Sequence, residues 1–77
     1  MNKVRRQALQ EIATKLEDIK SDIEMLRDEE QEYADNMPES LQSSEKHDNA
    51  ENAVSSMDSA VDSIDSAIDS IGESAEQ

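Results

Sequence analysis

The chain has 77 residues, of which 34% are hydrophobic, one is aromatic (Tyr33) and none is cysteine. A chain this short buries only about 60% of the surface that its unfolded form exposes, which allows one small domain and excludes a deep, enclosed active site. The lack of cysteine excludes a disulfide framework, a thiolate nucleophile and a thiolate zinc site. Because the sequence also has no Gly-rich phosphate loop and no histidine pair, we expect a protein that is not an enzyme and needs no cofactor.

Charge is the most unusual property of the sequence, since 20 acidic against 7 basic residues give a formal net charge of −13. Residues 1–27 hold six of the basic residues, and residues 28–77 hold Lys46 against fifteen acidic ones. Direct binding of nucleic acid needs a basic surface, so it is excluded as a function. No apolar run is long enough for a membrane span or a signal peptide, so we expect a cytoplasmic protein whose partners are other proteins.

A heptad pattern runs through the first half of the chain, with spacings that alternate between three and four residues. Its positions are Leu9, Ile12, Leu16, Ile19, Ile23, Leu26, Glu30 and Tyr33. These are the a and d positions of a coiled-coil-like seam, and the residues between them are mostly good helix formers. The spacing predicts one helix over about residues 3–34.

The second half of the chain repeats the same spacing. Its apolar positions are Ala50, Val54, Met57, Val61, Ile64, Ile68, Ile71 and Ala75. The Asp, Ser and β-branched residues of this segment are mediocre helix formers, so the segment needs a partner helix to pack against. We expect a second helix over about residues 45–71, with Gly72 as a C-cap glycine and a frayed tail over 72–77.

The connection over residues 35–44 contains the only proline of the chain. Pro38 breaks the first helix and suits the first turn of a short helical piece, and Leu41 is expected to fold back over the open end of the seam. Three residues are candidate caps of the next helix: Ser43, Ser44 and Asp48. A short connection between two long seams predicts an all-α fold, in which residues 1–77 form a single antiparallel two-helix hairpin.

Charged residues on the edges of the two seams predict how the helices align. Opposite signs meet on one edge if Lys20 lies near Asp58 and Arg27 lies near Glu51, and such exposed pairs select a register rather than hold the fold together. Alanines line the other edge: Ala53, Ala60 and Ala67. Because a two-helix seam is thin, we expect two hairpins to associate through this alanine edge into a dimeric four-helix bundle.

A stripe of carboxylates is predicted on the second helix, at Asp58, Asp62, Asp65 and Asp69. One interpretation is a row of negative charge that imitates the phosphates of a nucleic acid, and the other is a solvated helix face. A straight helix cannot wrap these oxygens around one calcium ion, and His47 lacks a second nitrogen or sulfur ligand. We therefore predict no metal site.

A second acidic cluster lies at the expected tip of the hairpin, where Glu29, Glu30 and Glu32 precede Tyr33. Glu30 occupies an a position, where a carboxylate weakens the seam. Tyr33 is either the last residue of the seam or an aromatic anchor for a partner. This cluster is a second candidate for partner binding.

Residues 28–42, DEEQEYADNMPESLQ, are followed by Ser-Glu-Lys and by a heptad tail of Ala, Ile and Asp. In these features the chain resembles a group of small acidic helical-hairpin proteins of bacteriophages and mobile elements, largely of unknown function. The resemblance implies a non-enzymatic role in the cytoplasm of a bacterium or an infected host.

Three functions follow from these patterns. The first is a self-associating protein-interaction protein, in the phage setting a factor that binds a host protein. The second is an acidic nucleic-acid mimic that inhibits a host defence or DNA-processing enzyme. The third is a small scaffold or assembly subunit whose only partner is a second copy.

Overall fold

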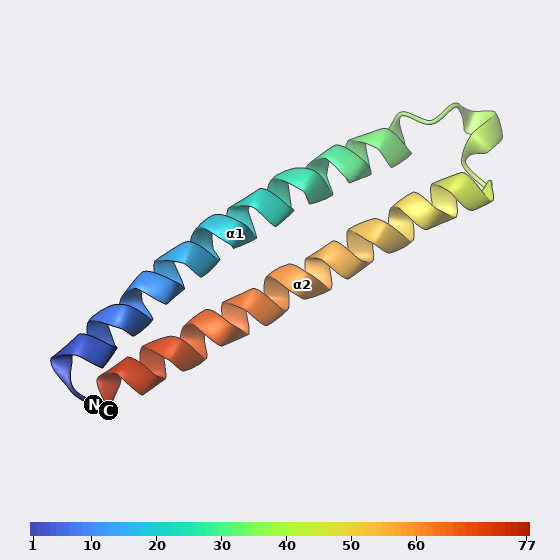
Figure 1. Ribbon diagram of the computed structural model, residues 1–77. Coiled ribbons are helices and arrows are strands. Elements are labelled where there is room, and N and C mark those ends of the chain that lie inside the picture. The colour runs from blue at the N-terminus through green and yellow to red at the C-terminus, as the bar shows by residue number, and fades with distance from the viewer.

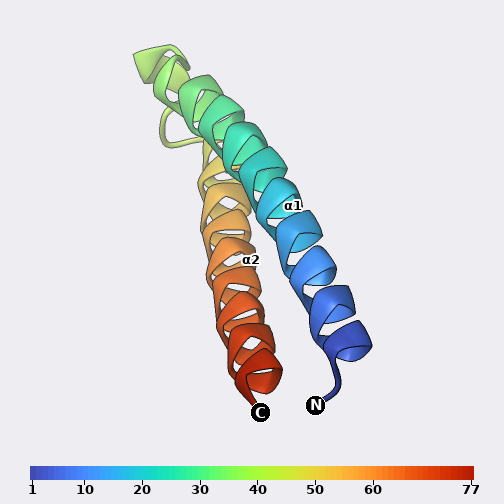
Figure 2. The same cartoon turned by 90° about the vertical axis from the view of Figure 1, so that its left-hand side faces the viewer.

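The computed structural model describes residues 1–77 and contains helices but no strand: α1 over Lys3–Asp35, the short 3-10 helix η1 over Glu39–Leu41, and α2 over Glu45–Glu76. The two long helices run antiparallel and side by side, with the connection at one end and both termini at the other (Figure 1). Seen from the side, the pair twists gently along its length (Figure 2). The chain measures 59 by 14 by 11 Å. The prediction of an all-α helical hairpin is confirmed.

The first helix begins where a side chain satisfies its free backbone groups. The Oδ1 atom of Asn2 accepts a hydrogen bond of 2.8 Å from the backbone N–H of Arg5, as an N-cap residue does. The helix then runs without Gly or Pro to Asp35, one residue beyond the expected end. Neither α1 nor α2 contains a stretch that is long and apolar enough to cross a membrane.

The connection is built as its turn residues predict. Pro38 precedes η1, and its carbonyl oxygen accepts a hydrogen bond of 2.8 Å from the N–H of Leu41. Of the three candidate caps, Ser44 is the one used, because its Oγ atom accepts the backbone N–H of His47 at 3.3 Å. The two long helices are therefore separated by a capped turn rather than by a kink.

The open end of the seam is covered by a different residue from the one expected. Leu41 is 45% exposed, whereas Met37 is only 8% exposed and packs with Ala34 and Ala50. The expectation for Leu41 is wrong because η1 carries Leu41 away from the helices, while Met37 directly follows the last turn of α1. Together with Val54, these three side chains are the only buried ones, so the core lies at the tip.

The far end of α2 also differs from the prediction. The helix continues through Gly72 to Glu76, and Gly72 does not adopt a positive φ, so it is not a C-cap. A contact from the other helix supports this last turn: the Nε atom of Arg6 donates a hydrogen bond of 2.8 Å to the carbonyl oxygen of Ala75. A cation at a helix C-terminus also interacts favourably with the helix dipole.

The seam forms as predicted on α2 but only in part on α1. Every predicted seam residue of α2 is buried or half-buried. On α1 the a positions Leu9, Leu16 and Ile23 are half-buried, whereas the d positions are exposed. The e positions have turned toward α2 in their place: Ala13, Lys20, Arg27 and Ala34. The a/d prediction is therefore wrong for the d positions of α1, which is rotated so that two of its basic side chains reach carboxylates of α2.

Candidate interaction surfaces

One broad side of the hairpin, which we call the ionic face, carries two ion pairs between the helices. The Nζ atom of Lys20 lies 2.9 Å from Oδ1 of Asp65, and the Nε atom of Arg27 lies 2.9 Å from Oδ1 of Asp58. The predicted partners, Asp58 for Lys20 and Glu51 for Arg27, are wrong by one heptad. Side chains on a helix lean toward its N-terminus. In an antiparallel pair this lean carries each basic side chain of α1 toward the C-terminal end of α2.

The two ion pairs shift the titration of their basic groups. The pKa of Lys20 is raised above its ordinary value, mainly because Asp65 accepts a hydrogen bond from Nζ, and partial desolvation works against this rise. The pKa of Arg27 is raised in the same way, first by its hydrogen bond to Asp58 and then by that to Asp28. Both basic groups therefore stay charged throughout the physiological pH range.

These ion pairs divide the predicted carboxylate stripe into two sets. Asp58 and Asp65 are held by Arg27 and Lys20, whereas Asp62 and Asp69 are exposed and make no ion pair within 4.0 Å. The stripe is therefore not four equivalent charges. Only two of its carboxylates are free to meet a cationic partner.

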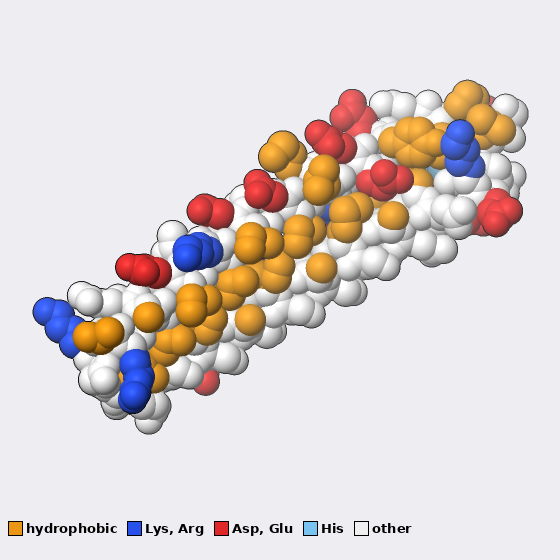
Figure 3. All heavy atoms as spheres, viewed as in Figure 1, with side chains coloured by type: hydrophobic (Ala, Val, Ile, Leu, Met, Phe, Trp, Pro, Cys, Tyr) orange, Lys and Arg blue, Asp and Glu red, His pale blue; other side chains and the backbone are white.

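The opposite side of the hairpin, which we call the apolar face, carries the exposed d positions of α1 and the alanines of α2. On α1 these are Ile12 (45% exposed), Ile19 (47%), Leu26 (56%) and Tyr33 (45%). On α2 they are Ala53 and Ala60, both half-buried, and Ala67, which is exposed. In a space-filling view the hydrophobic side chains form a band that runs along most of the molecule, with an acidic side chain between its central part and the tip (Figure 3). An apolar band of this length on a small protein is typical of an interaction surface.

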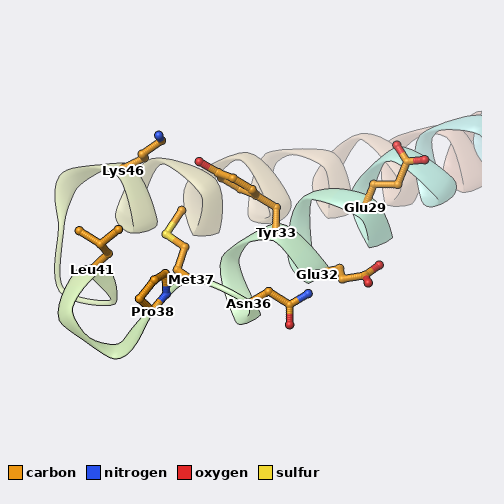
Figure 4. A pocket seen from close by; sticks show the side chains of 8 residues that line it. All are labelled: Glu29, Glu32, Tyr33, Asn36, Met37, Pro38, Leu41 and Lys46. Carbon is orange, nitrogen blue, oxygen red and sulfur yellow. The ribbon is translucent and has the colours of Figure 1, made fainter.

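The tip of the hairpin contains a hollow of about 510 Å³. Eight residues line it: Glu29, Glu32, Tyr33, Asn36, Met37, Pro38, Leu41 and Lys46. Figure 4 shows Tyr33, Met37 and Leu41 beside Lys46, with Glu29 and Glu32 farther back along α1. The structure thus brings together three of the four residues predicted at the tip.

Glu30 is the fourth of these predicted residues, and it does not line the hollow. Tyr33 is not the closed end of the seam, since nearly half of its side chain is exposed. The contribution of Lys46 was missed, although the predicted antiparallel hairpin already places the first turn of the second helix near Tyr33. The hollow is open, apolar at its base and charged at its rim, which suits a side chain of a partner protein better than a reacting substrate.

No arrangement of side chains resembles a metal site. The Nε2 atom of His47 lies 3.6 Å from Oε1 of Glu51, and nowhere do three or more His, Asp or Glu side chains gather as ligands would. The surfaces with functional potential are therefore the apolar face, the tip hollow and the two free carboxylates.

Comparison with known proteins adds no relative: no protein-family model, curated protein or solved structure matches the chain. What the protein does must therefore be inferred from its own surfaces.

Proposed function

We propose that this protein acts without catalysis, by protein–protein contact, and that its first partner is a second copy of itself. The observation that supports this proposal is the apolar face, where four large side chains at seven-residue intervals are each about half exposed. Exposed side chains that share one helix face and recur every heptad pack well against another helix. Two hairpins joined through this face would form a four-helix bundle.

The small core of the single hairpin supports the same proposal. Only four residues of the chain are buried, and three of them are alanine or valine. Ordering each residue costs about 1–2 kcal/mol of conformational entropy, which so small a core offsets poorly. Covering the apolar face would therefore stabilise the hairpin as well as assemble it.

Sedimentation equilibrium at tens of micromolar tests this proposal. We expect a dimer for the natural sequence and a monomer for the double variant Ala60→Glu with Ala67→Glu, because two carboxylates on the apolar face would have to be desolvated. The matched control is Ser59→Glu with Ser66→Glu, which adds the same charge at exposed positions that point away from α1. A natural chain that sediments only as a folded 8.6 kDa species would refute the proposal.

An acidic mimic of nucleic acid is the second candidate function, and the exposed, unpaired carboxylates of Asp62 and Asp69 favour it. They lie on a chain of net charge −13. A partner with a basic groove for nucleic acid would be attracted to such a surface, and salt would weaken the attraction over about 8–10 Å.

The mimic is tested by immobilising the protein and identifying what it retains from a bacterial lysate at low and moderate salt. We expect basic nucleic-acid-binding proteins on the natural chain and their loss from the double variant Asp62→Asn with Asp69→Asn. Asp58 and Asp65 are left unchanged, because they are held in ion pairs. Equal retention by the variant would exclude mimicry by these carboxylates, and an empty column would favour a scaffold whose only partner is a second copy.

A further inference from the structure

We infer that two copies pair face to face with their tips at the same end, so that α1 of each chain packs on α2 of the other. The inference rests on the proposed self-association and adds the arrangement of the pair. A symmetric dimer of two flat hairpins joined through one face has two simple solutions. A twofold axis along the helices places α1 on the partner's α2, whereas an axis across the helices places α1 on α1 and α2 on α2.

The sizes of the side chains favour the first solution. The α1 half of the apolar face is made of large residues such as Ile19 and Leu26, and the α2 half is made of Ala53, Ala60 and Ala67. With α1 over α2, large side chains meet small ones on both sides of the axis, and the interface has an even thickness. With α1 over α1, large side chains meet on one side and alanines on the other, which leaves either an overpacked edge or a void.

The charges beside the apolar face favour the same solution. The outer edge of α1 carries Lys15, Asp22 and Glu29, with a net negative charge, and the matching edge of α2 carries the neutral Ser56 and Ser63. Placing α1 over the partner's α2 sets each acidic edge against a neutral one. Placing α1 over α1 sets two edges of net negative charge against each other, which is less favourable than an acidic edge against a neutral one.

Lys46 adds a third observation. It lies at the rim of the tip hollow, makes no ion pair within 4.0 Å in its own chain, and is the only lysine or arginine among residues 28–77. When the tips lie at the same end, this ammonium is near the level of the partner's Glu29 and the partner's Glu32. The pairing therefore offers Lys46 partners of opposite charge across the interface.

The apolar face is large enough for an interface of standard size. The Cα extents of 59 by 14 Å give one broad face about 800 Å², which is close to what each partner buries in an interface of standard size. In the resulting dimer both ionic faces point outward, and the two tip hollows lie together at one end. The free carboxylates of Asp62 and Asp69 stay accessible to a further partner.

Disulfide trapping tests the arrangement directly, because the chain has no native cysteine. Chains carrying Ile19→Cys are mixed with chains carrying Ala60→Cys or Ala67→Cys, one of the two being tagged, and are oxidised mildly. We expect a disulfide-linked heterodimer from one of these mixtures. The competing arrangement is probed with a chain carrying both Ile19→Cys and Leu26→Cys, which would cross-link α1 to α1. Circular dichroism checks that each variant stays helical.

A distance measurement gives an independent readout that does not depend on core substitutions. Ser40→Cys, at the exposed turn of η1, is labelled with a nitroxide, and the spin–spin distance in the dimer is measured. With the tips together the distance is far below the 59 Å length of the hairpin, and with the tips apart it is about that length or more. Cross-linking of α1 to α1, a dimer without either disulfide, or a long distance would overturn the arrangement but leave self-association intact. A natural chain that is monomeric overturns both.

Discussion

The two broad faces of this hairpin use the same helices in different ways. On the ionic face, Lys20 and Arg27 of α1 form ion pairs with Asp65 and Asp58 of α2. On the apolar face, side chains of α1 as large as Leu26 stay exposed beside the alanines of α2. The apolar surface of α1 is therefore wider than the surface that α2 alone can cover. The ionic face fixes how α1 is rotated, and this rotation decides which apolar side chains are left for a second molecule.

The largest expected effect comes from charging the apolar face with Ile19→Asp and Leu26→Asp. If these side chains are buried on pairing, each contributes about 1.5–3 kcal/mol. We expect loss of the dimer, a large drop in the urea midpoint, and a midpoint that no longer depends on protein concentration. Thr14→Asp with Ser21→Asp adds the same charge at exposed positions on the far side of α1. Equal urea midpoints for the two double variants would show that the apolar face stays in contact with water and is not covered by a second copy.

The next effect comes from the tip, where both faces end on the same small core. Met37→Ala should lower the free energy of unfolding by about 2 kcal/mol, because a nearly buried side chain is lost beside Ala34 and Ala50. Met25→Ala is the matched control, since Met25 is 56% exposed and its truncation should cost less than about 0.5 kcal/mol. Urea titrations of both variants by circular dichroism measure the difference. Equal losses in the free energy of unfolding would mean that the buried tip core stabilises the hairpin no more than an exposed position does.

A smaller effect, of opposite sign, is expected at Gly72. This residue is helical, and a Cβ built on it meets no atom within 4 Å. Gly72→Ala should therefore raise the free energy of unfolding by about 0.5–1 kcal/mol. Thermal unfolding of the natural chain and of Gly72→Ala measures this increase in stability. A loss of stability would instead indicate that Gly72 ends the helix in a left-handed conformation, as its position in the sequence suggested.

The smallest effect is expected on the ionic face, from Asp65→Asn. The pair with Lys20 is partly solvated, so the melting temperature should fall by less than Gly72→Ala raises it, and salt should reduce the difference. Asp62→Asn, which breaks no ion pair, is the control. A fall as large as that of Met37→Ala would show that the ionic face holds the hairpin together rather than only orienting it.

The same pair gives a pH dependence whose sign is fixed by Lys20. Because its pKa is raised in the folded chain, the pair's stabilisation is fully present below the ordinary lysine value of 10.5 and is lost as the pH rises through the raised value. The difference in melting temperature between the natural chain and Asp65→Asn should therefore be level from neutral pH to about 10 and vanish above it. A difference that grows with alkaline pH would contradict the assigned pair.

Much of the fold could be predicted because the heptad spacing and the turn residues are local signals. The start of α1, the break at Pro38 and the cap at Ser44 all follow from single residues and their neighbours. The rotation of α1 could not be predicted in this way. Its a, d and e positions include apolar residues and long basic side chains, and the choice between them depends on carboxylates about forty residues away.

The candidate surfaces were predictable to a similar degree. The alanine edge and the tip residue Tyr33 were found from spacing, whereas the exposure of Ile12, Ile19 and Leu26 was not, because a heptad pattern marks apolar positions without saying which of them one partner helix covers. The division of the carboxylate stripe was also missed. This division depends on the direction in which the side chains of Lys20 and Arg27 extend along α1, and the heptad pattern does not give that direction.

The placement of the core at the tip has a consequence for the order of folding. Ala34, Met37 and Ala50 are separated by few residues, so the loop that joins them costs little entropy to close. The contact of Arg6 with Ala75, at the other end, joins residues 69 apart in sequence. We expect helix pairing to begin at the turn and to proceed toward the two termini. The hydrogen bond from Arg6 to Ala75 should therefore form last during folding and break first during unfolding.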